Sequence, residues 1–541
     1  MTGRELLLRA LRCEGVERTP WTPFVGCHAA ALLGISAEEY LKSEDRIVDG
    51  VSAAIERYQP DGIPILFDLQ VEAEVLGCEL RWAEDNPPSV VSSLLGGSTK
   101  IDDLAVPGPE QGRIGITLSA GRRLREAHPD IALYGLVTGP FTLALHLQGT
   151  DIFMRMFDDP EEVHRTMDFC RRTAEAMAGY YLDAGCDIVA LVDPMTSQIG
   201  PDQFTEFVSP HVAPVFDFVR GRGAIGSFFV CGHAQKNIEV MCDTRPENIS
   251  VDENIPLDYV RDICLERGVS FGGNMQLTTV LLLGKPEDAE RNAMECIELA
   301  GGDGFILAPG CDLPYATPPE NLEAVGRLVR DSYRQDVVKS MAARSGPGDV
   351  LDMTHYGEAD KVIVDIVTLD SEACAPCQYM VEAVRKVAPQ FDGIVEWREH
   401  KIKYREEVVF MASLMVKNIP TICIDGRIKF ISQIPARDEL VAAIQERINE
   451  KMRLKIRRRR AAVYLLGTDA EKMTEIESNV RRAMRELGTT SEIKILDDEE
   501  EIKAFGVHPS QTPAVVVARY QLKSSGGVPE VAAIKEWLRE T

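Results

Sequence analysis

The sequence predicts an α/β protein in which a (β/α)8 TIM barrel is followed by two smaller α/β domains. Two observations support the barrel. Short apolar runs alternate with amphipathic helical stretches from the start to about residue 336, and polar residues recur directly after these runs. Because the carboxyl ends of parallel strands meet at one mouth of a barrel, we expect the functional residues there. At 541 residues the chain is also too long for one hydrophobic core.

The expected barrel strands are short, apolar and rich in β-branched residues. They lie at 63–67, 132–137, 188–192, 224–230, 249–251, 270–273 and 304–307. Amphipathic helices fill the intervals, such as 160–184, where acidic residues and a proline suit the first helical turn. No Gly-x-Gly-x-x-Gly follows the first strand, which argues against a doubly wound dinucleotide-binding sheet.

Charge and composition exclude several classes of function. The formal net charge of -26 argues against nucleic acid or an anionic membrane surface as a partner. The N-terminal stretch reads as an amphipathic helix rather than a signal peptide, and no run approaches the length of a membrane span. We therefore expect a cytoplasmic protein. Its 13 cysteines fit reduced thiols, a few of them in functional positions.

Polar side chains follow most of the expected strands. They are Asp68, Asp193, Cys231, Asp252, Glu253, Asn274 and Cys311. Among them, Asp68, Asp193 and Asn274 are candidate catalytic residues at the shared mouth. The alternative for each is that it merely caps the following helix or turn.

Two of these strand ends carry a cysteine beside a glycine, at Cys231-Gly232-His233 and Gly310-Cys311. Two thiolates and an imidazole at one rim form a candidate zinc site. Zinc with an open position binds a substrate thiol and lowers its pKa, so that the thiol becomes a nucleophile. The alternative for His233 is a hydrogen-bonded loop residue, with the ligand shell completed by Asp193, Glu253 or His28.

Six segments along the first 335 residues or so resemble the uroporphyrinogen decarboxylase superfamily. They are 134–144 (YGLVTGPFTLA), 192–194 (VDP), 230–232 (VCG), 273–274 (GN), 304–314 (GFILAPGCDLP) and 317–321 (TPPEN). The superfamily includes porphyrinogen decarboxylases and enzymes that move a methyl group from a methylated corrinoid protein to a thiol such as coenzyme M. The resemblance implies one of these two activities.

Two features favour the methyltransferase branch. The decarboxylases hold substrate carboxylates with an arginine-rich segment, whereas residues 21–34 contain no arginine. The methyltransferases bind zinc through a His-x-Cys motif and a cysteine in Ala-Pro-Gly-Cys, which Cys231 and Cys311 match. Phe229 stands where the family has its histidine, so we expect His233 to act as the third ligand.

After a predicted linker at 339–360, residues 361–452 begin with an apolar strand, Cys374-Ala375-Pro376-Cys377 and an amphipathic helix. The helix N-terminus should lower the pKa of the first thiol for disulfide exchange. With Pro420 as a cis-proline, this domain resembles the thioredoxin family. The competing interpretation is zinc binding by Cys374 and Cys377, but no second cysteine pair lies nearby.

Residues 460–541 repeat this plan with a strand at 463–466, a helix at 471–487 and another proline strand at 510–517. Gly467-Thr468-Asp469 stands where the cysteines would be, so this second thioredoxin-like domain cannot exchange disulfides. We expect a structural or docking role. The basic run 457–460 should extend a solvated helix between the two domains.

The sequence thus predicts that barrel residues 1–338 transfer methyl groups from a corrinoid protein to a small-molecule thiol, with Cys374 and Cys377 as a redox disulfide. The methylcobamide must come on a partner protein, because the corrinoid-binding Asp-x-His-x-x-Gly motif is absent. Two alternatives remain open: porphyrinogen decarboxylation with Asp68 on the pyrrole N–H groups, and a thiol–disulfide oxidoreductase whose barrel binds a client.

Overall fold

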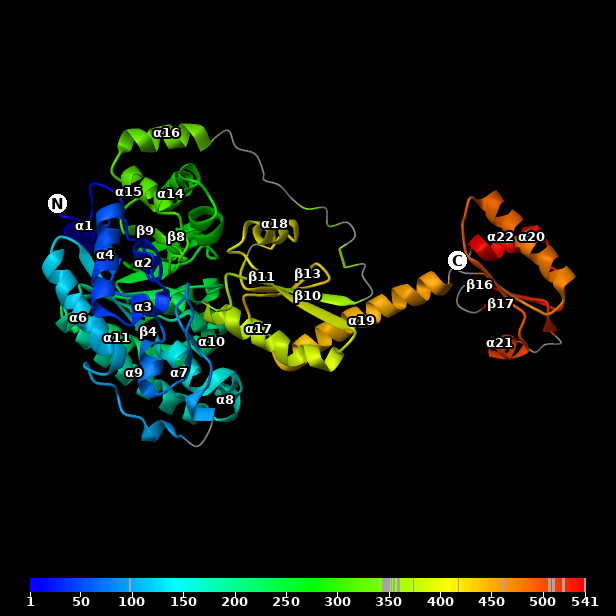
Figure 1. Ribbon diagram of the computed structural model, residues 1–541, viewed down its shortest axis with the longest axis horizontal. Helices are drawn as coiled ribbons and strands as arrows, with labels where there is room; N and C mark the ends of the chain where they lie inside the picture. Colours follow the sequence, from blue (N-terminus) through cyan, green and yellow to red (C-terminus); the bar gives the residue numbers. More distant parts are fainter. Residues whose placement is uncertain are drawn as a thin grey trace. The chain divides into compact units, whose positions relative to one another are not determined.

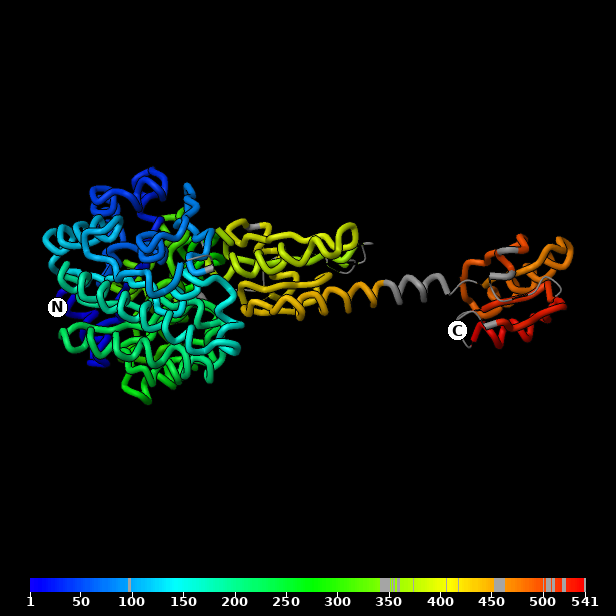
Figure 2. Tube along the Cα trace, turned by 90° about the horizontal axis from the view of Figure 1, so that it is seen from below, coloured from blue at the N-terminus to red at the C-terminus, as the bar shows by residue number. Residues whose placement is uncertain are grey.

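The computed structural model describes the chain except for a few positions. These are 97, 98, 343–350, 352, 354, 355, 358–360, 373, 417, 461, 462, 505, 506, 508–510, 518–520, 540 and 541. The chain divides into two compact units, Met1–Leu440 and Val441–Thr541, which are both traced in Figure 2. The first unit contains the barrel and the first thioredoxin-like domain.

The barrel sheet consists of seven parallel strands in the order β1-β4-β5-β6-β7-β8-β9. Figure 1 labels β4, β8 and β9 of this sheet. Their bounds are β1 (Gly62–Pro64), β4 (Ala132–Thr138), β5 (Ile188–Val192), β6 (Ile225–Val230), β7 (Asn248–Val251), β8 (Ser270–Met275) and β9 (Phe305–Pro309). Every residue of these strands is buried, as expected for a parallel sheet covered on both faces. Each strand predicted from an apolar run is confirmed, and so is the TIM-barrel fold class.

The eighth position of the barrel is held by a segment that the sequence did not reveal. Trp21 forms a parallel bridge with Leu307 of β9. On its other side, the carbonyl of Trp21 accepts a hydrogen bond of 2.8 Å from the N–H of Asp61, directly before β1. Two prolines flank this short stretch, at Pro20 and Pro23, so its pattern does not predict a strand.

Helices cover the outside of the barrel (Figure 1). Their bounds are α1 (Gly3–Leu11), α2 (His28–Leu33), α3 (Ala37–Leu41), α4 (Glu44–Tyr58), α5 (Val71–Leu76), α6 (Gly112–Ala127), α7 (Pro140–Gln148), α8 (Ile152–Asp158), α9 (Pro160–Asp183), α10 (Pro201–Gln203), α11 (Ser209–Gly221), α12 (Ile238–Asp243), α13 (Leu257–Glu266), α14 (Pro286–Ala300), α15 (Pro319–Leu328) and α16 (Ser332–Ala342). A small antiparallel pair, β2 (Leu80–Arg81) and β3 (Ser89–Val90), lies between α5 and α6. As predicted, α9 begins at a proline, and the side chain of Asp159 caps it by accepting from the N–H of Glu162.

The barrel interior holds its own apolar cluster, separate from the larger core between the sheet and the helices. Its aromatic members are Phe24, Phe67, Tyr134 and Phe229. These rings fill the barrel below its mouth, so the functional site is confined to the loops above the strand ends.

The first thioredoxin-like domain has a four-stranded sheet in the order β11-β10-β12-β13. Its elements are β10 (Val362–Thr368), α17 (Ala375–Val387), β11 (Val395–Lys401), α18 (Arg405–Ser413), β12 (Thr421–Ile424), β13 (Arg427–Ile431) and α19 (Arg437–Arg460). The predicted linker begins later than residue 339, because α16 continues to Ala342. Much of the remaining linker, including 343–350, lies outside the described residues.

The second unit repeats this topology, with strand order β15-β14-β16-β17. Its elements are β14 (Val463–Leu466), α20 (Ala470–Leu487), β15 (Ile493–Leu496), α21 (Glu499–Ala504), β16 (Ala514–Val517), β17 (Gln521–Ser525) and α22 (Val531–Arg539). Ser510 of the predicted proline strand lies outside the described residues. The boundary between the units falls inside α19, which contains the basic run 457–460. Within the described part of the chain, no helix is both long enough and apolar enough to cross a membrane.

Candidate functional site

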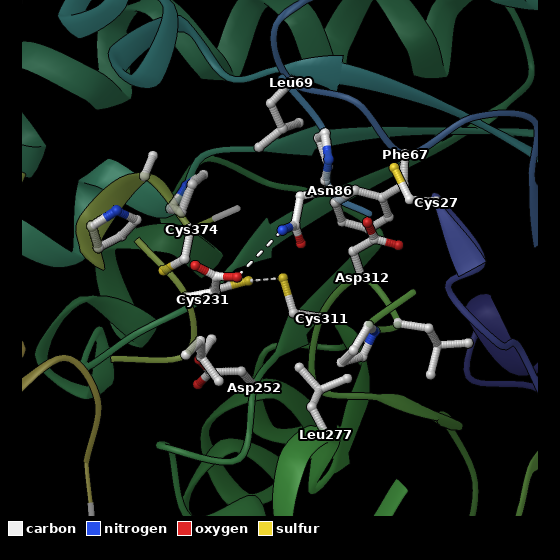
Figure 3. A pocket seen from close by; sticks show the side chains of 18 of the residues that line it. Cys27, Phe67, Leu69, Asn86, Cys231, Asp252, Leu277, Cys311, Asp312 and Cys374 are labelled. Carbon is white, nitrogen blue, oxygen red and sulfur yellow. Dashed lines mark hydrogen bonds between the residues drawn. The ribbon is translucent and has the colours of Figure 1, made fainter. Parts of the chain in front are cut away.

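A cavity of about 170 Å³ lies at the carboxyl ends of the barrel strands. Cys231 enters it directly after β6, Asp252 after β7, and Cys311 two residues after β9. Residues of the first thioredoxin-like domain, including Cys374, complete the lining, and Figure 3 shows these groups around one space. The strand-end cysteines predicted from the sequence are therefore brought together at the mouth of the barrel.

The thiols of Cys231 and Cys311 point toward each other (Figure 3), with their sulfur atoms 2.8 Å apart. Cys231 donates this contact, and the pKa of Cys231 is raised well above its usual range by that hydrogen bond and by burial. The hydrogen bond lowers the pKa of Cys311, but burial and the charge of Asp312 leave it raised. Both thiols therefore hold their protons at neutral pH unless a positive charge joins them.

Buried carboxyl groups surround the cysteine pair. Burial raises the pKa of Asp252 to about 6 and, together with the charge of Asp252, that of Glu253 to about 8. Burial also raises the pKa of Asp312 well above its usual range. One oxygen of Glu253 and one of Asp312 are buried without a hydrogen-bond partner. A cation bound near these groups would offset the cost of burying the carboxyl groups and thiols in their charged forms.

Zinc was predicted at this site, and the residues present supply two of its donors. Phe229, which stands in the place of the expected histidine, packs inside the barrel with its ring centroid 4.9 Å from that of Phe24. His233 instead faces the thioredoxin-like domain, with Nδ1 3.3 Å from Nδ2 of Asn418. Among the residues that the structure describes, no three His, Cys, Asp or Glu side chains form a metal-binding group. A complete zinc ligand set is therefore not assembled, and the role of His233 as a ligand stays a prediction.

His28, one of the three alternative zinc ligands, has other hydrogen-bond partners. Its Nε2 lies 2.6 Å from the hydroxyl of Tyr58, and its Nδ1 lies 3.1 Å from the carbonyl of Tyr315. Burial lowers the pKa of His28 to about 4, so the ring is neutral. His28 is thus a buried, hydrogen-bonded side chain at the start of α2.

Asp68 lines the cavity, and its charge is already paired. One oxygen accepts from the backbone N–H of Gln70 at 2.9 Å, and the other forms a buried ion pair with Arg113. Arg113 in turn lies 2.5 Å from Glu74. This arginine was missed by the sequence analysis, because a single arginine in the amphipathic helix α6 carries no motif.

Asp193 and Asn274 lie near the strand ends, and their side chains form hydrogen bonds with neighbouring elements of the barrel. Both oxygens of Asp193 accept from the start of α7, from the N–H of Phe141 at 3.0 Å and from the N–H and hydroxyl of Thr142 at 2.8 and 2.6 Å. Nδ2 of Asn274 donates to the carbonyl of Ile255 at 2.8 Å. Neither side chain lines the cavity, so their contacts match the capping alternative.

Cys374 is the N-cap residue of α17 and lines the cavity, whereas Cys377 is buried. The Ile419–Pro420 peptide bond is cis, and Pro420 also lines the cavity. The expectation that the helix start lowers the pKa of Cys374 is wrong for this arrangement. A hydrogen bond with Cys377 and burial raise the pKa of Cys374 well above its usual range.

Lys403 is the cation among the described residues that line the cavity, and Asp370 holds its Nζ at 2.7 Å. The described lining of the cavity therefore offers no free guanidinium or ammonium group to a polycarboxylate substrate. Lys403 and Asp370 could not be predicted for this site, because they reach it only through the contact of two domains.

The structure thus defines a TIM-barrel protein with a cysteine pair at its strand ends, joined to a thioredoxin-like domain with a Cys-x-x-Cys motif. The chain belongs to the uroporphyrinogen decarboxylase (URO-D) family, whose model matches residues 2–332. A thioredoxin domain model matches residues 462–539, the second of the two thioredoxin-like domains. The resemblance to the uroporphyrinogen decarboxylase superfamily is thereby confirmed, and the thioredoxin resemblance is confirmed for residues 462–539, whereas that of residues 361–452 to the thioredoxin family stays a prediction.

The relatives of the barrel have both activities of the superfamily. The methylcobamide:CoM methyltransferase MtbA of Methanosarcina acetivorans is 26% identical over 329 residues, which is 60% of this chain and 96% of the relative. A uroporphyrinogen decarboxylase of Synechococcus is 25% identical over 348 residues, 60% of this chain and 97% of the relative. A solved methyltransferase structure from Methanosarcina mazei, 25% identical, matches with a TM-score of 0.57 over 62% of this chain and 99% of its own.

Proposed function

We propose that this protein transfers a methyl group from a methylated corrinoid protein to a small-molecule thiol of the coenzyme M kind. The observation that carries the proposal is the pair Cys231 and Cys311 at the mouth of a URO-D family barrel. The similarity to methylcobamide:CoM methyltransferases supports the same reaction.

The cavity itself favours a small thiol over a porphyrinogen. Pockets for drug-sized ligands enclose roughly 300–1,000 Å³, whereas this cavity encloses about 170 Å³. Arg113 is paired with Asp68 and Glu74, and no arginine is among the described residues that line the cavity, so the site lacks a guanidinium group to hold substrate carboxylates. Asp68 is likewise occupied, which weakens its proposed role on pyrrole N–H groups.

In this proposal Cys231 and Cys311 would hold zinc, and a bound zinc ion would keep an acceptor thiol ionised near neutral pH. Asp252 fixes the turn that carries Cys231, because it accepts from the N–H of Gly232 at 2.6 Å. The acceptor thiolate attacks the methyl carbon of the corrinoid substrate. A thioether forms, and the electron pair of the broken cobalt–carbon bond stays on the partner's cobalt.

The thioredoxin-like dithiol has a protective role in the proposed reaction. A thiol acceptor or a cysteine ligand is inactive once it is oxidised to a disulfide, and Cys374 and Cys377 have the spacing of a disulfide reductant. A Cys374→Ser, Cys377→Ser variant should keep full activity with excess reductant and lose activity under mild oxidation. Equal oxidative sensitivity in the variant and the wild type would contradict this role.

The central test measures metal content and methyl transfer on the same preparations. Anaerobically purified wild type should contain about one zinc per chain and convert methylcobalamin and 2-mercaptoethanesulfonate to the thioether. A Cys231→Ser, Cys311→Ser variant should lose the zinc and at least about 99% of the rate, or roughly 2.7 kcal/mol of transition-state stabilisation. Cys170→Ser, a buried cysteine of α9, is the matched control.

Three outcomes would contradict the proposal. If the variant without both cysteines still formed the thioether, Cys231 and Cys311 would not be required for methyl transfer. Decarboxylation of a porphyrinogen without thioether formation would favour the decarboxylase alternative. Turnover of protein disulfides with neither activity would favour an oxidoreductase whose barrel binds a client.

A further inference from the structure

The cysteine pair of the barrel and the Cys-x-x-Cys motif of the first thioredoxin-like domain face the same cavity. Cys231, Cys311 and Cys374 all line it, and Pro420 lies beside them in the lining. Figure 3 shows the Cys374 side chain next to the pair. Thiols from the two domains share a cavity of about 170 Å³, so they can react within one chain without a bimolecular collision.

The loop around the cis-proline is hydrogen-bonded to the barrel. The N–H of Ile419, directly before Pro420, donates to Oδ1 of Asn254 at 3.3 Å. The neighbouring Asn418 contacts His233 at 3.3 Å. Asn254 follows β7 and His233 follows β6, so both contacts are made by the barrel loops that carry the cavity residues.

Further hydrogen bonds flank the cavity. Gln198 of the barrel donates through Nε2 to the carbonyl of Ser432 at 2.8 Å and accepts from the N–H of Ile434 at 2.8 Å. Gln378, in the first turn after Cys377, donates to the carbonyl of Val90 at 3.2 Å. These contacts come from separate parts of the thioredoxin-like domain, so they fix its orientation on the barrel mouth.

We propose that the thioredoxin-like dithiol acts within its own chain, with Cys374 reducing a disulfide between Cys231 and Cys311. The sulfur atoms of the pair are 2.8 Å apart, and a disulfide requires about 2.05 Å. Hydrogen peroxide takes two electrons and two protons from the pair and becomes two water molecules. The pair is thereby converted to a disulfide that can no longer hold a metal or activate a thiol.

The repair proceeds by two exchanges. The sulfur of Cys374 attacks that of Cys231, and Cys311 leaves with the bonding electrons and takes up the proton that Cys374 gives up. Cys377 then attacks Cys374 and releases Cys231. Two electrons have thereby moved from the thiols of Cys374 and Cys377 to the disulfide between Cys231 and Cys311. An external dithiol then reduces Cys374 and Cys377 again. The disulfide between Cys231 and Cys311 is thus the substrate of the protective reduction described under the proposed function, and this inference rests on that function.

The experiment traps the intermediate in the full-length protein. Cys377→Ser lacks the second nucleophile, so after peroxide treatment it should accumulate a disulfide between Cys374 and Cys231, identified by mass spectrometry of non-reduced peptides. Cys423→Ser is the matched control, because it removes another buried cysteine of the same domain that does not line the cavity. It should show no trapped species.

A rate measurement completes the test. With limiting dithiothreitol, the Cys231–Cys311 disulfide should be reduced at least about tenfold more slowly in Cys374→Ser than in wild type. Equal rates together with no trapped disulfide would overturn the proposal. Loss of bound zinc in Cys374→Ser would overturn it as well, since Cys374 would then be a ligand. A trapped disulfide in a protein without methyl transfer would overturn the proposed function and leave this inference standing.

Discussion

The ring centroid of Phe229 lies 4.9 Å from that of Phe24 inside the barrel, at the strand position where the resemblance to the methyltransferase branch predicted a zinc-binding histidine. Phe229 and Cys231 are two residues apart at the end of β6, and alternate residues of a strand face the same side. The position of the missing ligand is therefore filled by an aromatic core residue. Restoring a histidine at position 229 should therefore change both metal binding and stability.

Phe229→His should tighten zinc binding by at least about tenfold, or about 1.4 kcal/mol, because it returns a nitrogen donor to the cysteine pair. It should also lower the free energy of unfolding of the metal-free protein by about 1–3 kcal/mol, because a polar ring replaces a buried apolar one. Competition with a chromogenic chelator and urea unfolding measure the two effects. Phe229→Leu should lose stability without gaining affinity, and equal zinc affinity in all three proteins would contradict the prediction.

Asp193→Ala should lower the free energy of unfolding by about 2–4 kcal/mol, since it leaves buried N–H groups at the start of α7 without an acceptor. Zinc content should not change, because Asp193 does not line the cavity. Asp202→Ala, at an exposed position in α10, provides the comparison. Loss of methyl transfer by folded Asp193→Ala at unchanged stability would instead indicate the catalytic role first expected from the sequence.

Arg113→Ala should cost about 3–5 kcal/mol of stability, because it leaves the buried carboxylate of Asp68 without its positive partner. Combining Arg113→Met with Asp68→Asn removes both charges and should recover most of this loss. Arg122→Ala, at an exposed position of the same helix, should stay within about 0.5 kcal/mol of wild type. Chemical denaturation curves measure all three. A double variant as unstable as Arg113→Ala would show that packing of the arginine stem, not charge pairing, dominates.

His146 should make the protein sensitive to acid. Both ring nitrogens are buried without a hydrogen-bond partner, and burial lowers the pKa of His146 to about 4. The pKa of this histidine in the unfolded chain is about 6.5. Between pH 6.5 and pH 4 the unfolded chain therefore binds more protons than the native protein, so the free energy of unfolding falls as the pH falls. From pH 7 to pH 5 this residue should cost about 2 kcal/mol.

The matched variants for this prediction are His146→Leu and His146→Gln, which both lack a titrating group but differ in polarity. Unfolding measured from pH 5 to pH 7 should show a shallower pH dependence in both variants than in wild type. If only the leucine variant differs, the effect comes from a buried polar group and not from protonation.

The sequence predicted the barrel well because its strands are uniform apolar runs, and the cysteine pair because each cysteine follows such a run. Trp21 could not be predicted as the eighth strand position, because a single bridge between two prolines leaves no periodic pattern. The pairing of Asp68 with Arg113 was equally hidden, since it joins a loop to a helix 45 residues away. The approach of Cys374 to Cys231 depends on how two folds dock, and no local pattern encodes that contact.

The bridge between Trp21 and Leu307 also determines when the barrel can be completed. The segment that fills the eighth position precedes the seven barrel strands in the chain, and its neighbour β9 is the last of them. Until β9 emerges, β8 and the Trp21 segment both present unpaired backbone groups, which invite pairing with other chains. A nascent or truncated chain that ends before β9 should therefore be prone to aggregation. The sheet closes only when the Trp21 segment pairs with β9, and its edge backbone groups are then no longer open to other chains.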